Sequence, residues 1–298
     1  MNIVVTGGAG FIGSTLTDKL ISLGMNVIVI DNLSTGKVEN IHPKAEFWNM
    51  DLFNLEEDSL VNKNIDVVFH LAALARVQPS IKDPITFNQS NVDGTLKLLL
   101  ACHKGNVKRV VYSASSSCYG DTTIFPTPES SPTNPLSPYG LQKYIGEQYC
   151  KMFSEVYDLD TCSLRYFNVY GDKMTLDGAY KLAIPIFAEQ IKNNQACTIN
   201  NDGEQRRDFT HVDDVVEANL LAATHPDKLK GESFNIGNGD NLSVNEVVDL
   251  MGGKKSYGNI VIEPKITLAD NSKAKLVLGW APKRNLQTWI KSYLDKIL

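Results

Sequence analysis

The stretch "VVTGGAGFIG", residues 4–13, decides the fold of this 298-residue chain. It joins a short apolar run (2–6), rich in β-branched residues, to a segment (11–24) with apolar residues at helical spacing. A buried parallel strand, a tight turn and a helix are therefore predicted in succession. Gly7, Gly10 and Gly13 occupy the turn and follow the pattern G-x-x-G-x-x-G. Glycines there let the backbone approach a bound group, and the helix start attracts an anion.

An acidic residue completes this pattern. Asp31 ends the next apolar run (26–30) and follows Gly13 by 18 residues, close to the ~20 expected for an acid that binds a ribose. The combination predicts a dinucleotide site, and the alternative is a plain glycine turn beside a solvated Asp. A carboxylate repels a 2′-phosphate, and "DNLSTGK" (31–37) contains no Arg, so we expect NAD rather than NADP.

Strand and helix patterns continue to alternate beyond this motif. Strands are expected at 46–50, 66–72, 107–115 and 160–171, and helices at 88–105 and 139–157. This predicts an α/β fold with a Rossmann-like doubly wound parallel sheet. After about residue 170 the segments shorten, with helices expected at 183–194, 213–224, 243–251 and 286–297. We expect an NAD-binding Rossmann domain over 1–170 and a smaller α+β substrate-binding lobe over 171–298, parts of which return to the sheet.

Composition excludes several classes of protein. The net charge of −5 argues against a nucleic-acid partner, which needs a clustered basic face. The five cysteines form no C-x-x-C pair, so neither a disulfide framework nor a metal site is expected. The N-terminus resembles no signal peptide, and no apolar run approaches the ~20 residues of a membrane helix. A soluble cytoplasmic protein is expected.

A second stretch, "SPYGLQKYIGEQ" (137–148), points to acid–base chemistry. Tyr139 and Lys143 lie one helical turn apart, and a nearby ammonium favours a phenolate that can act as a base. Alone, such a pair is usually an ordinary surface Tyr and Lys. The serines Ser115, Ser116 and Ser117 end the predicted strand 107–115, at the sheet edge where such folds bind ligands.

Taken in order, "TGGAGFIG", "DNLSTG", "FHLAA", "SASSSCYG", "PYGLQK" and "RYFNVYG" resemble the extended short-chain dehydrogenase/reductase family. Within it, the chain is most similar to nucleotide-sugar 4-epimerases of the UDP-galactose and UDP-N-acetylglucosamine kind, as far as "LADNSKAKLVLGWAP" (268–282). The resemblance implies an isomerase with tightly bound NAD, a transient 4-keto sugar and a homodimer. The alternatives are another nucleotide-sugar epimerase or an oxidoreductase of the same family and, after these, a non-catalytic NAD-bound sensor.

The resemblance also implies roles for individual residues. Catalysis falls to Ser115, Tyr139 and Lys143. Cofactor contacts, besides Tyr139 and Lys143, fall on Gly7, Gly10, Phe11, Ile12, Gly13, Asp31, Asn32, Ser34, Gly36, Asp51, Leu52, Leu71, Ala72, Ala73, Asn91 and Phe167. Substrate contacts fall on Ser115, Ser116, Ser117, Asn168, Arg207 and Thr267.

Three further features refine this interpretation. Related dehydratases carry Asp-Glu after the catalytic Ser/Thr, where this chain has Ser116 and Ser117. Thr267 falls on the position that limits substrate size and is small, so N-acetylhexosamines are expected to fit. The family's R-x-G-D loop, which helps to hold the diphosphate and a ribose, is shortened here and lacks its Arg. The identity of the bound nucleotide is therefore not predicted. His70 and His211 are expected to be structural, and Arg76 is either a substrate contact or a surface residue.

Overall fold

The computed structural model describes residues 1–174 and 182–297. Within these residues a seven-stranded parallel sheet has the order β11-β6-β5-β4-β1-β2-β3. The order reverses between β1 and β4, which is where open α/β sheets bind ligands. This architecture confirms the predicted Rossmann-like fold. The strands are β1 (Asn2–Thr6), β2 (Asn26–Asp31), β3 (Glu46–Asn49), β4 (Val67–His70), β5 (Arg109–Ser115), β6 (Thr161–Tyr166) and β11 (Glu232–Ile236).

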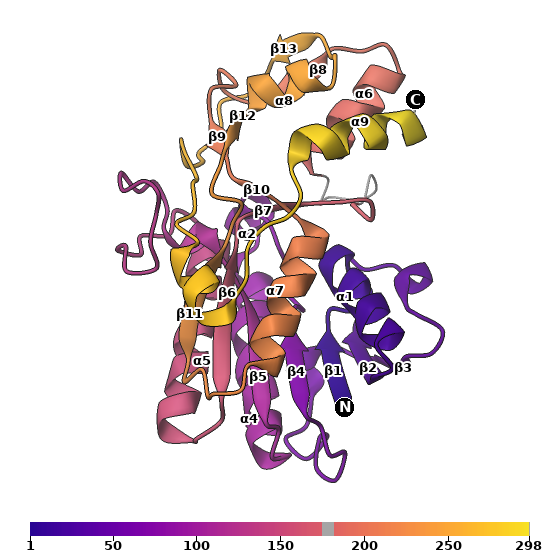
Figure 1. Cartoon of the computed structure of the whole chain (residues 1–298), viewed down its shortest axis with the longest axis vertical. Helices are drawn as coiled ribbons and strands as arrows, with labels where there is room; N and C mark the ends of the chain where they lie inside the picture. Colours follow the sequence, from indigo (N-terminus) through magenta and orange to yellow (C-terminus); the bar gives the residue numbers. More distant parts are fainter. Residues whose placement is uncertain (175–181, 298) are drawn as a thin grey trace.

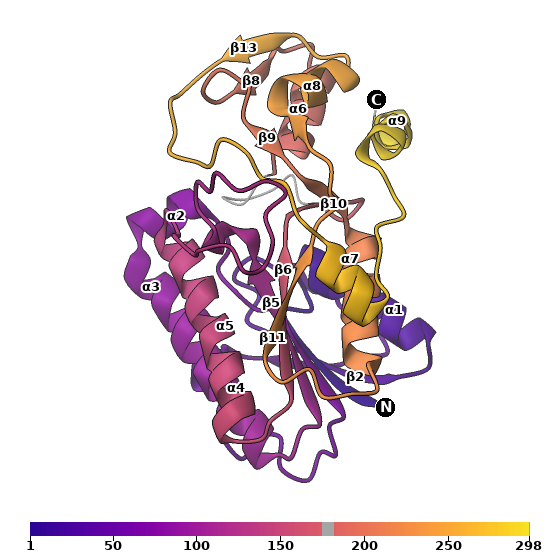
Figure 2. The same cartoon turned by 60° about the vertical axis from the view of Figure 1, so that its left-hand side comes forward.

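Helices cover both faces of the sheet (Figure 2). One face carries α4 (Gly94–Lys104) and α5 (Pro138–Val156), and the other carries α1 (Phe11–Ser22) and α7 (Val212–Thr224). Successive residues of β1 enter different cores: Ile3 and Val5 pack with α1 and α7, whereas Val4 packs with α4 and α5. Burial on both faces is the reason that this strand is apolar throughout rather than alternating.

The helix expected at 88–105 begins earlier than the periodicity indicated. Helix α3 (Pro84–Asn88), a π-helical turn (Gln89–Asp93) and α4 follow one another without a break. Asp83 caps α3 by accepting from the backbone N–H of Thr86 at 3.1 Å, and Pro84 occupies the first turn. The short helix α2 (Val77–Lys82) was not predicted.

The single strand expected at 160–171 is wrong, because the chain leaves the sheet at Phe167. The N–H of Phe167 donates to Ile236 at the end of β11, and the N–H of Asn168 donates to Asp208. The following strand, β7 (Asn168–Tyr170), pairs with β10 (Phe209–His211) outside the main sheet. These two distant partners turn the chain toward the upper part of the molecule (Figure 1).

A smaller lobe lies above the carboxyl ends of the strands (Figure 1). Phe187, Val247, Trp289 and Ile290 belong to its own buried core. Its elements are α6 (Ala183–Lys192), α8 (Val244–Leu250), α9 (Leu286–Ile297), β8 (Cys197–Ile199), β9 (Arg206–Arg207), β12 (Leu242–Ser243) and β13 (Lys255–Tyr257). Helix α7 and strand β11 also come from beyond residue 170, but they join the Rossmann sheet.

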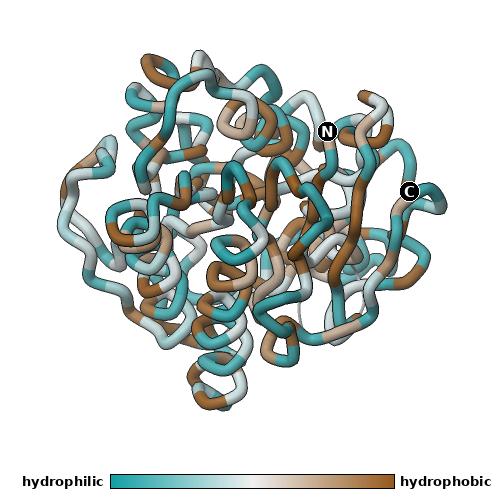
Figure 3. The backbone as a smooth tube through the Cα atoms, turned by 90° about the horizontal axis from the view of Figure 1, so that it is seen from below, coloured by the Kyte–Doolittle hydropathy of each residue, from teal (hydrophilic) through white to brown (hydrophobic). Residues whose placement is uncertain are grey.

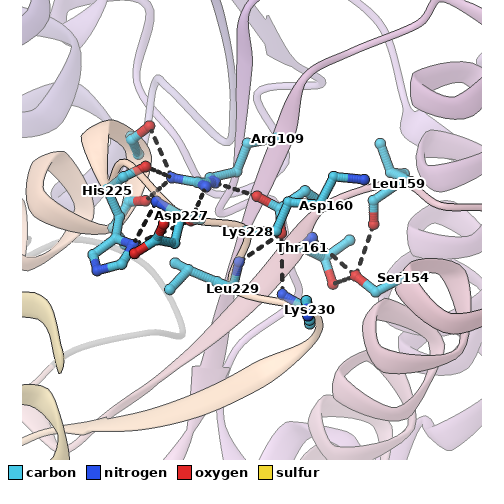
Figure 4. A network of polar contacts seen from close by, with 12 residues as sticks. Arg109, Ser154, Leu159, Asp160, Thr161, His225, Asp227, Lys228, Leu229 and Lys230 are labelled. Atoms are coloured by element: carbon cyan, nitrogen blue, oxygen red, sulfur yellow. Dashed lines mark hydrogen bonds and ion pairs between the residues drawn. The ribbon is translucent and has the colours of Figure 1, made fainter.

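A buried polar network holds the end of α7 against the sheet, at the end of the sheet that lies away from the smaller lobe (Figure 4). Arg109, the first residue of β5, donates from Nε to Asp160 Oδ2 at 2.6 Å. Its other nitrogens donate to the carbonyls of Ala222, His225 and Asp227 at 2.7–2.8 Å. One arginine thus binds β5, the approach to β6 and the end of α7 together.

The distribution of hydropathy agrees with these layers. Along the surface helices, hydrophobic and hydrophilic residues alternate within a turn (Figure 3). Within residues 1–174 and 182–297, no helix is long and apolar enough to cross a membrane.

Candidate active site

The glycine loop joins β1 to α1 at the point where the strand order reverses. Gly7 has φ +71°, and a Cβ there would lie 2.7 Å from the Ala72 nitrogen. A Cβ on Gly13 would lie 2.2 Å from the Gly7 carbonyl oxygen. Only glycine fits these approaches. No side chain in the described part of the chain caps α1, so the first N–H groups of the helix, including those of Phe11 and Ile12, remain available to an anion.

Asp31 ends β2 beside this loop and is 8% exposed. Its Oδ2 accepts from the Ala9 N–H at 3.0 Å, and its Oδ1 accepts from the Leu33 N–H at 2.8 Å. Burial raises the pKa of the Asp31 carboxyl, and the Leu33 and Ala9 N–H groups partly offset the increase. The acid and the glycine loop, predicted as one motif, are therefore in direct contact.

A cleft opens between the glycine loop and the loops that follow β2, β3 and β4. Ten residues predicted to contact a cofactor line it: Gly7, Gly10, Asp31, Asn32, Ser34, Asp51, Leu52, Leu71, Ala72 and Ala73. Five lining residues were not predicted: Ile30, Thr35, Met50, Leu74 and Ser90. Each of them neighbours a predicted residue in sequence, and that adjacency was the available signal.

Gly36, Asn91 and Phe167 are predicted cofactor residues that do not line the cleft. The amide of Asn91 holds the N–H and the carbonyl of Leu74 at 2.8 and 2.9 Å and donates to Gln142 at 3.0 Å. Gly36 packs closely against Ala9, where a Cβ would lie 2.7 Å from the alanine Cβ. Phe167 is buried next to Tyr119, with ring centroids 6.5 Å apart.

Tyr139 lies in the first turn of α5, at the end of β5. Ser137 caps this helix by accepting from the Gly140 N–H at 3.1 Å, and Pro138 opens it. Burial raises the pKa of the Tyr139 phenol; a hydrogen bond from Ser115 and the charge of Arg76 lower it in part. The effect of the Lys143 ammonium on this pKa stays a prediction.

Lys143 is 4% exposed, one turn further along α5. Its Nζ lies 4.7 Å from the centre of the Tyr112 ring, within cation–π range. Burial lowers the pKa of Lys143 to about 7. Burial therefore disfavours the charged form of the Lys143 amine.

The three serines form a compact turn. Ser115 ends β5, and its Oγ accepts from the Ser117 N–H at 3.2 Å and from the Ser117 hydroxyl at 2.8 Å. Ser116 begins a 3₁₀ turn over Ser116–Cys118. The turn places the Ser115 hydroxyl between Ser117 and Tyr139.

Three of the residues predicted for substrate, Asn168, Arg207 and Thr267, lie around Asp208, an acid that sequence reasoning missed. Thr267 Oγ1 accepts from the Asp208 N–H at 3.1 Å and lies 3.5 Å from Asn168 Oδ1. The Asp208 carboxylate accepts backbone N–H groups of Asn238, Gly239 and Ala269 at 2.6–3.0 Å. Burial raises its pKa to about 6. The available signal was an acid directly after two arginines, Arg206 and Arg207.

Arg207 itself is engaged within the protein. Its Nη2 pairs with Glu263, whose other carboxylate oxygen accepts from Asn201 at 2.9 Å and from Gln205 at 3.3 Å. The shortened loop thus brings an acid to the arginine that was predicted to hold the diphosphate.

His70 and His211, the two histidines predicted to be structural, are held by hydrogen bonds within the fold. His70 lies between the hydroxyls of Thr6 and Thr95, each at 2.8 Å, and burial lowers its pKa to about 3. His211 precedes α7 and caps it by accepting from the Asp213 N–H at 3.1 Å.

Comparison with known proteins gives a consistent result. Residues 3–237 match the model of the NAD dependent epimerase/dehydratase family. A UDP-glucose 4-epimerase of Mycolicibacterium smegmatis is 36% identical over 300 residues, with 95% of this chain and 94% of the relative covered.

Two solved structures superpose over nearly the whole chain. The UDP-glucose 4-epimerase of Thermotoga maritima with UDP-glucose has a TM-score of 0.93 at 39% identity, covering 99% of this chain and 98% of the other. The UDP-N-acetylglucosamine 4-epimerase of Methanobrevibacter ruminantium in complex with UDP-N-acetylmuramic acid has a TM-score of 0.92 at 36% identity, covering 99% and 97%.

Proposed function

Because this chain belongs to the NAD dependent epimerase/dehydratase family, we propose that it is a UDP-sugar 4-epimerase that interconverts UDP-glucose and UDP-galactose with bound NAD. The observation that carries the proposal is the hydrogen bond between Ser115 and Tyr139 at the carboxyl end of β5. Asn91 joins the same helix, through Gln142, to Leu74 in the lining of the cleft. The similarity to UDP-sugar 4-epimerases over the full chain supports it.

The cleft fits NAD. The glycine loop leaves room that a Cβ would fill, and the first turn of α1 offers N–H groups to a pyrophosphate. The Asp31 carboxylate suits ribose hydroxyls and disfavours a 2′-phosphate. When bound, NAD supplies a reversible two-electron acceptor for oxidation at a sugar carbon.

The residues at the end of β5 handle the proton. Tyr139 takes the proton of the sugar 4-hydroxyl and later returns it, and Ser115 connects the two oxygens by hydrogen bonds. Lys143 lies one turn further along α5, where the family resemblance implies that it holds the ribose of the cofactor. The sugar passes through a 4-keto form and turns over before the hydroxyl is restored on the opposite face.

The substrate side favours a nucleotide sugar of modest size. Arg207 directly precedes Asp208, whose N–H donates to Thr267 Oγ1, and a guanidinium suits a diphosphate. Thr267 leaves more room than a large aromatic side chain would. We therefore extend the proposal to UDP-N-acetylglucosamine and UDP-N-acetylgalactosamine.

The test is a product assay without added NAD. Purified protein receives each of UDP-glucose, UDP-galactose, UDP-N-acetylglucosamine and UDP-N-acetylgalactosamine, and products are separated by chromatography. We expect each sugar to be converted to its C4 epimer. Released NADH with an accumulating keto sugar would instead identify an oxidoreductase. Retained NAD with no conversion of any of the four would refute the epimerase and favour a sensor.

We also propose a homodimer that pairs α4 and α5 of two copies. Helix α5 carries Leu141 and Val156 with 46% and 67% of their surface exposed, next to α4. Exposed apolar side chains on α5 favour burial against a second copy. Sedimentation equilibrium should give twice the mass of 32.9 kDa.

A reducing compartment such as the cytoplasm is proposed for the protein. All five cysteines are free and buried: Cys102, Cys118, Cys150, Cys162 and Cys197. Burial raises the pKa of the Cys102, Cys118 and Cys162 thiols, so these thiols are unreactive packing groups.

A further inference from the structure

The start of α5 is held by side chains from outside the helix. Its first residue, Pro138, has no backbone N–H, and the Gly140 N–H is accepted by the Ser137 hydroxyl at 3.1 Å. The N–H between them, that of Tyr139, is accepted by the Ser80 hydroxyl at 3.1 Å. The first N–H groups of a helix have no partner within it, so these two hydroxyls fix the end of α5 that carries Tyr139.

Ser80 lies in α2, 59 residues before Tyr139 in the chain. Its side chain is fully buried, and its hydroxyl donates to the Val77 carbonyl at 2.7 Å. Because that bond uses the only hydrogen of the hydroxyl, the oxygen can meet the Tyr139 N–H only as an acceptor. Loss of the Ser80 hydroxyl would therefore leave a backbone donor of α5 without its partner.

The segment that carries Ser80 also borders the cofactor cleft. Leu74 lines the cleft, and the Asn91 amide holds the N–H and the carbonyl of Leu74 at 2.8 and 2.9 Å. The same amide donates to Gln142 of α5, which in turn donates to the Pro84 carbonyl at 3.3 Å. The lining of the cleft and the first turns of α5 are thus joined at two points, through Ser80 and through Gln142.

The backbone between these two attachments is constrained. Arg76, directly before α2, has φ +116° and ψ 137°, a conformation that residues with side chains rarely adopt. Such a conformation persists only where the surrounding structure holds it in place. Leu74 and Ser80, on either side of Arg76, therefore belong to a segment whose shape is determined by the fold.

We propose that Ser80 is a positioning residue, whose hydrogen bond to the Tyr139 N–H fixes the start of α5, and with it the Tyr139 side chain, relative to the cofactor cleft. Its effect on turnover rests on the proposed 4-epimerase function. A reacting group displaced by about 1 Å can lose roughly 10²-fold in rate, so a hydrogen bond that fixes the backbone beside the phenol bears on catalysis.

Hydrogen exchange of the Tyr139 N–H tests this attachment without substrate. Mass spectrometry with electron-transfer fragmentation resolves the amide in the NAD-loaded protein. In Ser80→Ala the amide loses its acceptor, and we expect its protection to fall about fivefold, the scale of one net hydrogen bond. Ser80→Cys keeps most of the side-chain volume but is a weak acceptor, so it should give a similar fall without a cavity. Protection equal to that of the parent protein in both variants would overturn the proposal.

Ser154 provides a matched control near the other end of α5 (Figure 4). Its hydroxyl donates to the Leu159 carbonyl at 2.7 Å and accepts from the Thr161 N–H at 3.0 Å, so its removal costs the helix a comparable pair of bonds. Ser154→Ala should leave the protection of the Tyr139 N–H unchanged. An equal fall in Ser154→Ala and Ser80→Ala would reflect a general loosening of α5 and would also overturn the proposal.

Steady-state kinetics provides the second readout. For Ser80→Ala we expect kcat to fall about tenfold with KM and bound NAD close to those of the parent protein, because the binding contacts remain in place. Ser154→Ala should keep the parent kcat. A raised KM with unchanged kcat, or loss of NAD, would contradict the proposal. If the parent protein converts no sugar nucleotide, the epimerase proposal fails, and exchange of the Tyr139 N–H alone decides whether Ser80 positions Tyr139.

Discussion

Arg207 and Glu263 form an ion pair in which the side chains are only 10% and 27% exposed. The pair joins β9 to the shortened segment that precedes Thr267, and Asn201 and Gln205 hold the same carboxylate. Glu263 therefore binds the Arg207 guanidinium to which a diphosphate would also bind. Substrate binding must compete with this internal acid.

Glu263→Gln should tighten binding of UDP. The amide keeps acceptor and donor groups for its neighbours but removes the competing charge, so we expect the Kd of UDP measured by calorimetry to fall by roughly threefold to tenfold. Glu217→Gln, which removes an equal charge from a surface pair with Lys283, is the matched control and should change nothing. Weaker binding would show that Glu263 itself contacts the nucleotide.

Tyr139→Phe should abolish epimerisation and leave NAD in place. Removal of one hydroxyl takes away the group that exchanges the proton, which is worth roughly 10²–10⁴-fold in turnover. Tyr149→Phe, a partly buried tyrosine later in the same helix, should stay active. If the Tyr139→Phe variant lost both its activity and its bound NAD, the hydroxyl would serve mainly to hold the cofactor.

Gly13→Ala should cost the protein its bound NAD. The new Cβ would lie 2.2 Å from the Gly7 carbonyl oxygen, so the loop must move away from the pyrophosphate position. Gly24→Ala is the control, because Gly24 has φ +77° but no atom within 4 Å of its added Cβ. It should lose about 1 kcal/mol of stability and keep NAD. Equal NAD content in the two variants, measured by mass spectrometry, would contradict this assignment.

Glu147→Gln should destabilise the fold more than any surface ion pair does. Glu147 follows Lys143 by one turn and binds buried Arg165 of β6 through both carboxylate oxygens at 2.5 and 2.8 Å. Breaking such a pair leaves a buried charge, at about 3–5 kcal/mol. Urea unfolding should show this loss, and Glu155→Gln, from the exposed pair with Lys151, should cost under about 0.5 kcal/mol. Similar losses of stability in the Glu147→Gln and Glu155→Gln variants would indicate that water solvates Arg165 once its partner is removed.

Thr267→Tyr should separate the two sugar classes. A tyrosine ring would occupy the space assigned to an N-acetyl group, so conversion of UDP-N-acetylglucosamine should fall at least about tenfold while UDP-glucose is still converted. Thr267→Val tests the loss of the hydroxyl bonds to Asp208 and Asn168 at nearly constant size. If the valine variant shows the same selectivity, the hydroxyl rather than size controls the choice.

The fold was predictable where one local pattern decides it. β1 and β2 are apolar because both faces of the sheet are covered, and α9 keeps the bounds that its periodicity gave. The division between β6 and β7 was not predictable, because it depends on hydrogen bonds from Phe167 to Ile236 and from Asn168 to Asp208. Those partners lie 69 and 40 residues away, beyond the range of any periodic pattern.

The candidate site likewise contains parts that a local sequence pattern predicts and parts that only the fold brings together. Gly7 and Asp31 belong to one motif, so the sequence places them together, and the structure adds only the Ala9 N–H that connects them. The pairing of Arg207 with Glu263 is set by a fold contact across 56 residues. The positive φ of Arg76 depends on the anchoring of its loop to α5, which no pattern of residue types reveals.

Strand β11 has a consequence for synthesis of the chain. It completes the sheet beside β6, yet it is made about 70 residues after that strand, once much of the upper lobe has been translated. Until then β6 is an unpaired edge, which is prone to associate with other chains. A nascent chain that stops near residue 170 therefore lacks a strand of its own sheet, and the protein can reach its final form only after both lobes have left the ribosome.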